Sequence, residues 1–291
     1  MTGENKIDHS MADKVILITG AKGFIGKNLI ARLHSAGLNN TLEYDKDTDE
    51  SLLAEYTKDC DFVFHLAGVN RPKDEKEFKE GNTDFTYKLT RLLSENPKKP
   101  GLLMTSSIQA ALANPYGESK KAGEGAVFSY GEQTFSPVFV YRLPNVFGKW
   151  SRPNYNTVVA TFCYNVARDI PIQVNDRSTM LRFVYIDDVV DEFLNAFEGK
   201  AASLTDGIIY GSAFEGRSDS RSVTEEPALC PEDAHRYKGI RRIHEITLGG
   251  LADMITSFKG TEDTEAKPDL SDPLTEAMYS TYLSFLPEKD L

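Results

Sequence analysis

Residues 19–26 read Thr-Gly-Ala-Lys-Gly-Phe-Ile-Gly and separate a continuous apolar run at 15–19 from an amphipathic pattern of helical period. Such a run predicts a parallel strand buried on both faces. The glycines have different tasks: Gly20 permits the tight turn, Gly23 lets the backbone approach a pyrophosphate, and Gly26 lets the helix pack closely on the strand. The stretch therefore predicts a Rossmann fold with a dinucleotide phosphate loop.

The helix after this loop is expected to begin with free N–H groups and the positive end of its dipole, which attract phosphate. Asp45 follows Gly26 by nineteen positions, and its carboxylate can bind the adenosine ribose and repel a 2′-phosphate, which favours NAD(H). Lys46 can neutralise a 2′-phosphate, which leaves NADP(H) open, and both charges can also be solvated loop residues. The cofactor-binding candidates here are Gly20, Lys22, Gly23, Phe24, Ile25, Gly26, Asp45 and Lys46.

The first half of the chain alternates apolar runs with helical patterns, which implies a parallel sheet with right-handed crossovers. The fold class is therefore α/β, a doubly wound Rossmann sheet with a smaller C-terminal substrate lobe. We expect a disordered leader at 1–13, the dinucleotide-binding domain at 14–150, and a partly interleaved substrate lobe at 151–291. Strands are expected at 15–19, 41–44, 62–67, 102–106 and 138–143, and helices from 24 to a stop at Gly37, at 75–94 and at 116–130.

The pattern is less regular beyond residue 150. The segment 212–239 is polar and without periodicity, so it is predicted to be an exposed loop. Thr247 is expected to cap a helix that ends near Phe258, and Asp272 with Pro273 to start the last helix. Further helices are expected at 155–168 and 188–197, and short strands at 172–174 and 183–185.

Composition excludes several classes of protein. The 291 residues carry a net charge of −11, which argues against binding to nucleic acid or to an anionic membrane surface. There is no apolar run long enough to span a bilayer. The three cysteines have no metal-ligand spacing, so no metal site is expected, and their odd number suits a reducing compartment. A cytoplasmic location is the default expectation.

A candidate catalytic set follows the fourth predicted strand. Tyr116 and Lys120 are four residues apart in a predicted helix, so both lie on one face. An ammonium near the phenol is expected to lower the pKa of Tyr116 and to let it exchange a proton with a carbonyl or hydroxyl oxygen. Ser107 ends the preceding strand, at the edge where open α/β sheets bind ligands. The alternative is that Tyr116 is a core residue and Lys120 a surface residue, and that neither takes part in catalysis.

Several motifs together resemble a known family. They are the glycine loop, DFVFHLAG at 61–68, the strand-end serines, YGESK at 116–120 and RLPNVFG at 142–148. The set resembles the extended short-chain dehydrogenase/reductase family (NAD-dependent epimerases/dehydratases), which acts mainly on nucleotide sugars. The stretches 65–72, 106–120, 144–168 and 276–287 resemble more narrowly the reductase domain of the CapF-like subgroup of capsular polysaccharide-synthesis proteins.

The resemblance assigns roles to single residues. Ser107 would orient the substrate carbonyl, Tyr116 would be the acid or base, and Lys120 would bind the nicotinamide ribose. His65 would lie at the cofactor groove or, equally, be a satisfied core histidine. The asparagines that the resemblance places in the substrate site can instead form turns, and Asn154 follows a proline, which favours a turn. The groove would also include Leu66, Ala67, Gly68 and Asn82, and the substrate site Asn145, Asn154, Asn156 and Arg182.

The resemblance implies an NAD(P)H-dependent reductase of a nucleotide-linked 4-keto-6-deoxy sugar, of the UDP-4-keto-6-deoxy-HexNAc type, in capsular or surface polysaccharide precursor synthesis. It also implies NADP(H) as cofactor and a homodimer. Relatives of the CapF-like subgroup continue into a metal-binding cupin domain that epimerises the sugar, and this chain stops before one. We therefore expect either a separate cupin-type epimerase or a truncated chain.

Two other functions compete with the reductase. An epimerase or 4,6-dehydratase with tightly bound NAD would share the fold, but dehydratases carry an Asp-Glu pair where Ile108 and Gln109 stand here, and these cannot transfer protons. Epimerisation stays open. A non-enzymatic NAD(P) sensor is the second alternative, since fold alone does not fix function. The family's Arg-Asp pair is replaced by Leu181 and Arg182, which weakens Arg182 as a phosphate ligand.

Overall fold

The computed structural model describes residues 11–155, 157–201, 236–261 and 267–287. Asn156, most of the expected leader and most of the 212–239 segment lie outside this range. The described chain forms two compact units, 11–143 with 190–201 and 236–241, and 144–189 with 242–287 apart from the gaps. The chain thus first changes unit at Leu143, earlier than the expected boundary at 150, and later returns to the first unit.

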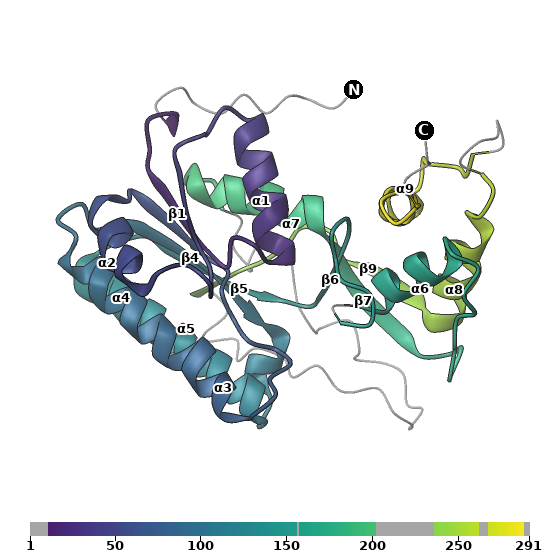
Figure 1. Cartoon of the computed structure of the whole chain (residues 1–291), viewed down its shortest axis with the longest axis horizontal. Coiled ribbons are helices and arrows are strands. Elements are labelled where there is room, and N and C mark those ends of the chain that lie inside the picture. Colours follow the sequence, from purple (N-terminus) through teal and green to yellow (C-terminus); the bar gives the residue numbers. More distant parts are fainter. Residues whose placement is uncertain (1–10, 156, 202–235, 262–266, 288–291) are drawn as a thin grey trace. The chain divides into compact units, whose positions relative to one another are not determined.

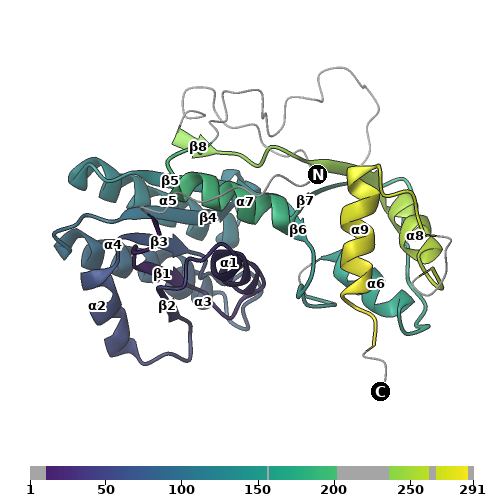
Figure 2. The ribbon, with the colours of Figure 1, turned by 90° about the horizontal axis from the view of Figure 1, so that it is seen from above.

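The first unit is built on a parallel sheet with the strand order β2-β1-β3-β4-β5-β8. Because β2 and β3 lie on opposite sides of β1, the order in which strands are added to the sheet reverses between β1 and β3. In such folds ligands bind at this point, outside the carboxyl ends of the strands. Figure 2 shows β8 beside β5 at one edge. The strands are β1 (Ile16–Thr19), β2 (Thr41–Tyr44), β3 (Phe62–His65), β4 (Gly101–Ser107), β5 (Val138–Leu143) and β8 (Tyr237–Lys238).

Helices cover both faces of this sheet, as the doubly wound prediction requires. Val63 of β3 packs with Leu53, Leu89 and other apolar side chains of α2, α4 and α5 on one face. Phe62 and Phe64 alternate with it and contact aromatic rings of α7 on the other face. Figure 1 shows α4 and α5 side by side. The helices are α1 (Phe24–Ser35), α2 (Glu50–Asp59), α4 (Phe85–Glu95), α5 (Pro115–Thr134) and α7 (Ile186–Phe197).

Three features of the first unit differ from the sequence predictions. Helix α2 was not predicted, because its burial rests on Leu53 and Thr57 alone. The single helix expected at 75–94 is α3 (Lys76–Phe78), a π-helical turn (Lys79–Asp84) and α4. The expected loop at 212–239 contains β8, which forms because the ring of Tyr237 is buried in the unit and its backbone pairs with Val140.

The second unit contains a sheet of order β6-β7-β9, parallel between β6 and β7 and antiparallel between β7 and β9. Thr247 and Asp272 cap the helices that follow them, as predicted. The strand expected at 172–174 is wrong: these residues pair with no described strand and pack only partly buried against the core. The elements are β6 (Asn145–Phe147), α6 (Val158–Val166), β7 (Met180–Tyr185), β9 (His244–Thr247), α8 (Leu248–Ser257) and α9 (Pro273–Leu283).

No helix in the described part of the chain is both long and apolar enough to cross a membrane.

Candidate cofactor and catalytic site

The glycine loop has the shape of a pyrophosphate cradle. Gly20 adopts φ +73°, and a Cβ there would lie 2.7 Å from the backbone nitrogen of Ala67. A Cβ on Gly26 would lie 2.3 Å from the carbonyl oxygen of Gly20. Gly23 is the N-cap of α1 and makes no side-chain capping hydrogen bond, so a side-chain cap does not occupy the N–H groups of the first turn. These features fit the phosphates of a dinucleotide at the helix N-terminus.

Asp45 connects the end of β2 to this loop. Its Oδ2 accepts the backbone N–H of Lys22 at 2.8 Å, and its Oδ1 accepts that of Lys46 at 2.8 Å. The ammonium of Lys22 is bonded to Asp47 at 2.6 Å on the exposed surface. The carboxylate predicted to bind ribose therefore lies beside the phosphate loop, with the side chain of Lys46 exposed next to it.

A buried series of hydrogen bonds joins the carboxyl ends of β1 and β3 to α4. The hydroxyl of Thr86 donates to the carbonyl of Asn82 at 2.5 Å, so its oxygen accepts the Nε2–H of His65 at 2.8 Å. Nδ1 of His65 then accepts the hydroxyl proton of Thr19 at 2.7 Å. Burial, with the nearby charge of Lys120, lowers the pKa of His65 to about 3. His65 is thus a neutral core histidine with both nitrogens bonded inside the protein.

Asn82 fixes the segment that follows β3. Its side chain accepts the N–H of Val69 and donates to the carbonyl of Val69, both at 2.8 Å, and also donates to the hydroxyl of Ser119 at 2.9 Å. The π-helical turn accommodates the extra residue that brings this side chain inward. Gly68, next to Val69, is exposed, and a Cβ there would lie 3.0 Å from Oδ1 of Asn82. Sequence reasoning named Asn82 but missed Thr19 and Thr86, because hydroxyl residues within buried elements give no local signal.

The three catalytic candidates meet at the end of β4. Tyr116 lies in the first turn of α5 and is hydrogen-bonded to Ser107. The buried ammonium of Lys120 donates to the carbonyl of Thr105 at 2.8 Å. It also lies 3.4 Å from the position of a Cβ on Gly68, which places it beside the loop after β3. The arrangement gathers a phenol, a hydroxyl and an ammonium at the carboxyl end of β4.

The pKa of Tyr116 differs from the sequence prediction. Burial raises it, and the hydrogen bond from Ser107 opposes this only in part. The expectation that Lys120 lowers the pKa of this phenol is wrong here, because the ammonium is bonded to the carbonyl of Thr105 instead. Burial lowers the pKa of Lys120 itself to about 8. Tyr116 is therefore a neutral phenol at physiological pH, the form that donates a proton.

The residues expected to contact substrate belong to the second unit. Asn145 is exposed on β6, Asn154 has a left-handed backbone with φ +56°, and Arg182 is paired with Glu245 at 2.7 Å. Asn156 lies outside the described residues.

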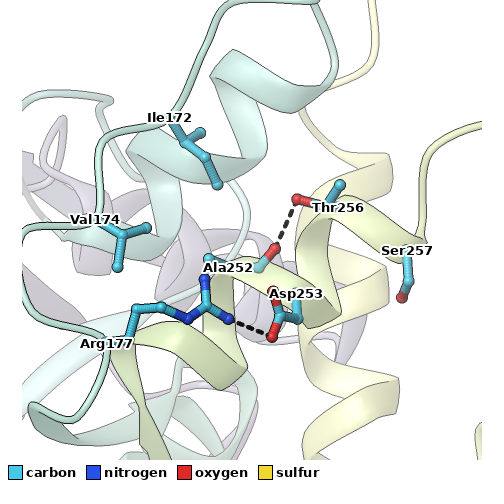
Figure 3. A pocket seen from close by; sticks show the side chains of 7 residues that line it. All are labelled: Ile172, Val174, Arg177, Ala252, Asp253, Thr256 and Ser257. Carbon is cyan, nitrogen blue, oxygen red and sulfur yellow. Dashed lines mark hydrogen bonds and ion pairs between the residues drawn. The ribbon is translucent and has the colours of Figure 1, made fainter.

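The second unit also contains a pocket of about 590 Å³ that no sequence prediction named. Figure 3 shows Arg177 and Asp253 next to each other among its lining residues. The guanidinium pairs with the carboxylate at 2.5 Å. Its other lining residues are Ile172, Val174, Ala252, Thr256 and Ser257.

Comparison with known proteins shows the family of the chain. The chain belongs to the NAD dependent epimerase/dehydratase family, whose model matches residues 16–209. It is 42% identical over 273 residues to the UDP-2-acetamido-2,6-beta-L-arabino-hexul-4-ose reductase of Pseudomonas aeruginosa, covering 94% of this chain and 65% of that protein.

Two solved structures show the same fold. The capsular polysaccharide assembling protein CapF from Staphylococcus aureus superposes with a TM-score of 0.74 and 38% identity, over 94% of this chain and 65% of CapF. The Bordetella bronchiseptica enzyme WbmF in complex with NAD+ has a TM-score of 0.68 at 19% identity, over 94% and 93% of the two chains, and supports the fold alone. The Rossmann prediction is confirmed. The chain spans less than two thirds of the length of the reductase and of CapF.

Proposed function

We propose that this chain is an NAD(P)H-dependent reductase of a nucleotide-linked 4-keto-6-deoxy sugar of the UDP-4-keto-6-deoxy-HexNAc type. The single observation that carries the proposal is that the fold brings Ser107, Tyr116 and Lys120 to the carboxyl end of β4, in the sheet whose first strand leads into the glycine loop. The 42% identity to a 4-keto sugar reductase supports the substrate class. The product would feed capsular or surface polysaccharide synthesis in the cytoplasm.

The residues of this chain divide the chemistry among them. When bound, a reduced nicotinamide supplies a hydride to the carbonyl carbon of the substrate. Tyr116 donates its phenolic proton to the carbonyl oxygen, which becomes the hydroxyl of the product. Ser107 would hold the same oxygen by a hydrogen bond, and Lys120 would hold the nicotinamide ribose. The raised pKa of Tyr116 suits this direction, because the free enzyme keeps the proton that reduction consumes.

The choice between NADPH and NADH depends on the loop after β2. The carboxylate of Asp45 opposes a 2′-phosphate, whereas the exposed ammonium of Lys46 favours one. We propose NADPH as the preferred donor, on the resemblance to the CapF-like subgroup, with NADH as the alternative that Asp45 supports.

The remaining contacts are part of the same proposal. Asn145 and Arg182 would bind the phosphates of the nucleotide, and Asn154 with Asn156 would contact the sugar. A homodimer and a separate cupin-type epimerase are the proposed protein partners.

The decisive experiment follows oxidation of NADPH and of NADH with UDP-4-keto-6-deoxy-HexNAc, with and without a separate 3-epimerase. Tyr116→Phe is expected to reduce kcat by about 10²–10⁴-fold while the affinity for dinucleotide stays within a few-fold. Tyr87→Phe, at an exposed tyrosine of α4, is the matched control and should behave as wild type.

Each other outcome has a defined meaning. Near-normal oxidation by Tyr116→Phe refutes the assignment of the proton donor. Failure of wild type with both dinucleotides under both conditions refutes the reductase. Cofactor that survives purification without net consumption of added NADPH identifies the epimerase instead, and binding without conversion of any ketosugar identifies a sensor.

A further inference from the structure

Helix α5 carries a second buried charge one turn beyond Lys120. Glu124 is 1% exposed, and its carboxylate has donors from three different strands. The hydroxyl of Ser106 on β4 donates to it at 2.5 Å. The guanidinium of Arg142 on β5 donates through Nε at 2.8 Å and Nη2 at 2.6 Å. The hydroxyl of Tyr237 on β8 donates at 3.0 Å.

The place of this cluster in the fold relates it to the catalytic candidates. Ser106 stands between two residues of the site: the carbonyl of Thr105 holds the ammonium of Lys120, and Ser107 is hydrogen-bonded to Tyr116. A buried ion pair is a weak source of net stability, because the desolvation of both charges offsets their attraction. Because the pair is bonded to Ser106, between Thr105 and Ser107, its position points to a role in holding the site.

The same cluster explains why β8 joins the sheet at all. Tyr237 contributes one of only two strand residues, yet its ring lies 4.2 Å from the guanidinium of Arg142 and edge-on to Phe128. Because Nη2 of Arg142 donates to the Tyr237 oxygen at 2.8 Å, the phenolic proton is directed to Glu124. The carboxylate thus binds α5 to β4, β5 and β8 together.

The charges that face Lys120 come from few groups among the described residues. On α5 the group is Glu124. From β3 His65 faces it as a neutral imidazole, and from β5 Arg142 is bonded to Glu124. Burial lowers the pKa of Lys120, and the negative charge of Glu124 opposes that effect.

We propose that Glu124 is a positioning residue of this site: its carboxylate fixes α5 against the ends of β4, β5 and β8, and it places a negative charge one helical turn from Lys120, on the same face of the helix. Lys120 then reaches the dinucleotide as a cation at neutral pH. The inference rests on the proposed function only for the contact between Lys120 and the dinucleotide.

The test measures NAD(P)H affinity by fluorescence between about pH 6 and 10, the range in which a partly desolvated lysine titrates. Glu124→Gln is expected to move the alkaline midpoint of binding down by about one unit, since Lys120 loses its proton earlier. Glu132→Gln is the matched control on the same helix: Glu132 is exposed and pairs with Arg236 at 3.0 Å, so the midpoint should stay at the wild-type value. An unchanged midpoint in Glu124→Gln overturns the proposal.

Two further variants separate charge from structure. Tyr237→Phe loosens the cluster but keeps the carboxylate, so we expect a lower Tm with an unchanged midpoint of binding. If Glu124→Gln does not fold, because Arg142 is left unpaired, Glu124→Asp keeps the negative charge with a shorter side chain, so the midpoint should stay at the wild-type value while Tm falls. A midpoint that falls in Tyr237→Phe as well would assign the effect to structure and overturn the charge role.

The readout also separates this inference from the proposed function. Dinucleotide binding by wild type without any turnover of ketosugar refutes the reductase but leaves the test of Glu124 intact. No dinucleotide binding by wild type refutes both.

Discussion

His65 gives a quantitative prediction for the stability of the chain in acid. Its pKa in the folded protein is about 3, against 6.5 for an ordinary histidine. Above pH 6.5 the imidazole is neutral in both states and contributes no pH dependence. Below it the unfolded chain binds a proton that the folded chain refuses, so stability is lost as the pH falls toward 3. At pH 4.5 the loss is two pKa units, or about 2.7 kcal/mol.

His65→Gln removes this titration and isolates the effect. The variant is expected to be less stable than wild type at pH 7 by about 1–3 kcal/mol, because one amide cannot replace both ring hydrogen bonds. Its free energy of unfolding should then fall by about 2.7 kcal/mol less than that of wild type between pH 7 and 4.5. The two proteins therefore approach one another in stability as the solution becomes acidic.

The assay is urea unfolding at several pH values, followed by tyrosine fluorescence and circular dichroism. His34→Gln removes an exposed histidine of α1 and serves as the matched control. Parallel loss of stability in wild type and His65→Gln would refute the reasoning, because it would mean that the folded protein accepts the proton on His65 after all.

Two further predictions concern the phosphate loop. Gly26→Ala places a methyl group 2.3 Å from the Gly20 carbonyl oxygen, so we expect a loss of about 1–3 kcal/mol in stability and at least tenfold weaker dinucleotide binding. Gly125→Ala, in α5 with nothing within 4 Å of the new methyl group, is the control and should be neutral or stabilising. Asp45→Asn should raise the ratio of kcat/KM for NADPH over NADH by about tenfold, because it removes a negative charge beside the 2′-position; an unchanged ratio excludes Asp45 from the choice of cofactor.

The sequence by itself determined the features that local spacing controls. Gly20, Gly23 and Gly26 lie within seven consecutive residues that span the loop and the first turn of α1, so their order along the chain already defines the turn and the start of the helix. The spacing of Tyr116 and Lys120 within one helix likewise defines a common face. Ser107 could be assigned to the same candidate site because the carboxyl ends of parallel strands lie at one edge of the sheet.

Tertiary structure decided what depends on burial and on partners far along the chain. The direction of the pKa shift of Tyr116 follows from desolvation, which no spacing reveals, and it reversed the prediction made from Lys120. The tautomer of His65 depends on hydroxyls 46 and 21 residues away, at Thr19 and Thr86. Glu124 acquires its role only because separate strands bring their donors to one carboxylate. The loop proposed to bind a dinucleotide is formed by residues close together in the chain, whereas the charges around it are set by packing.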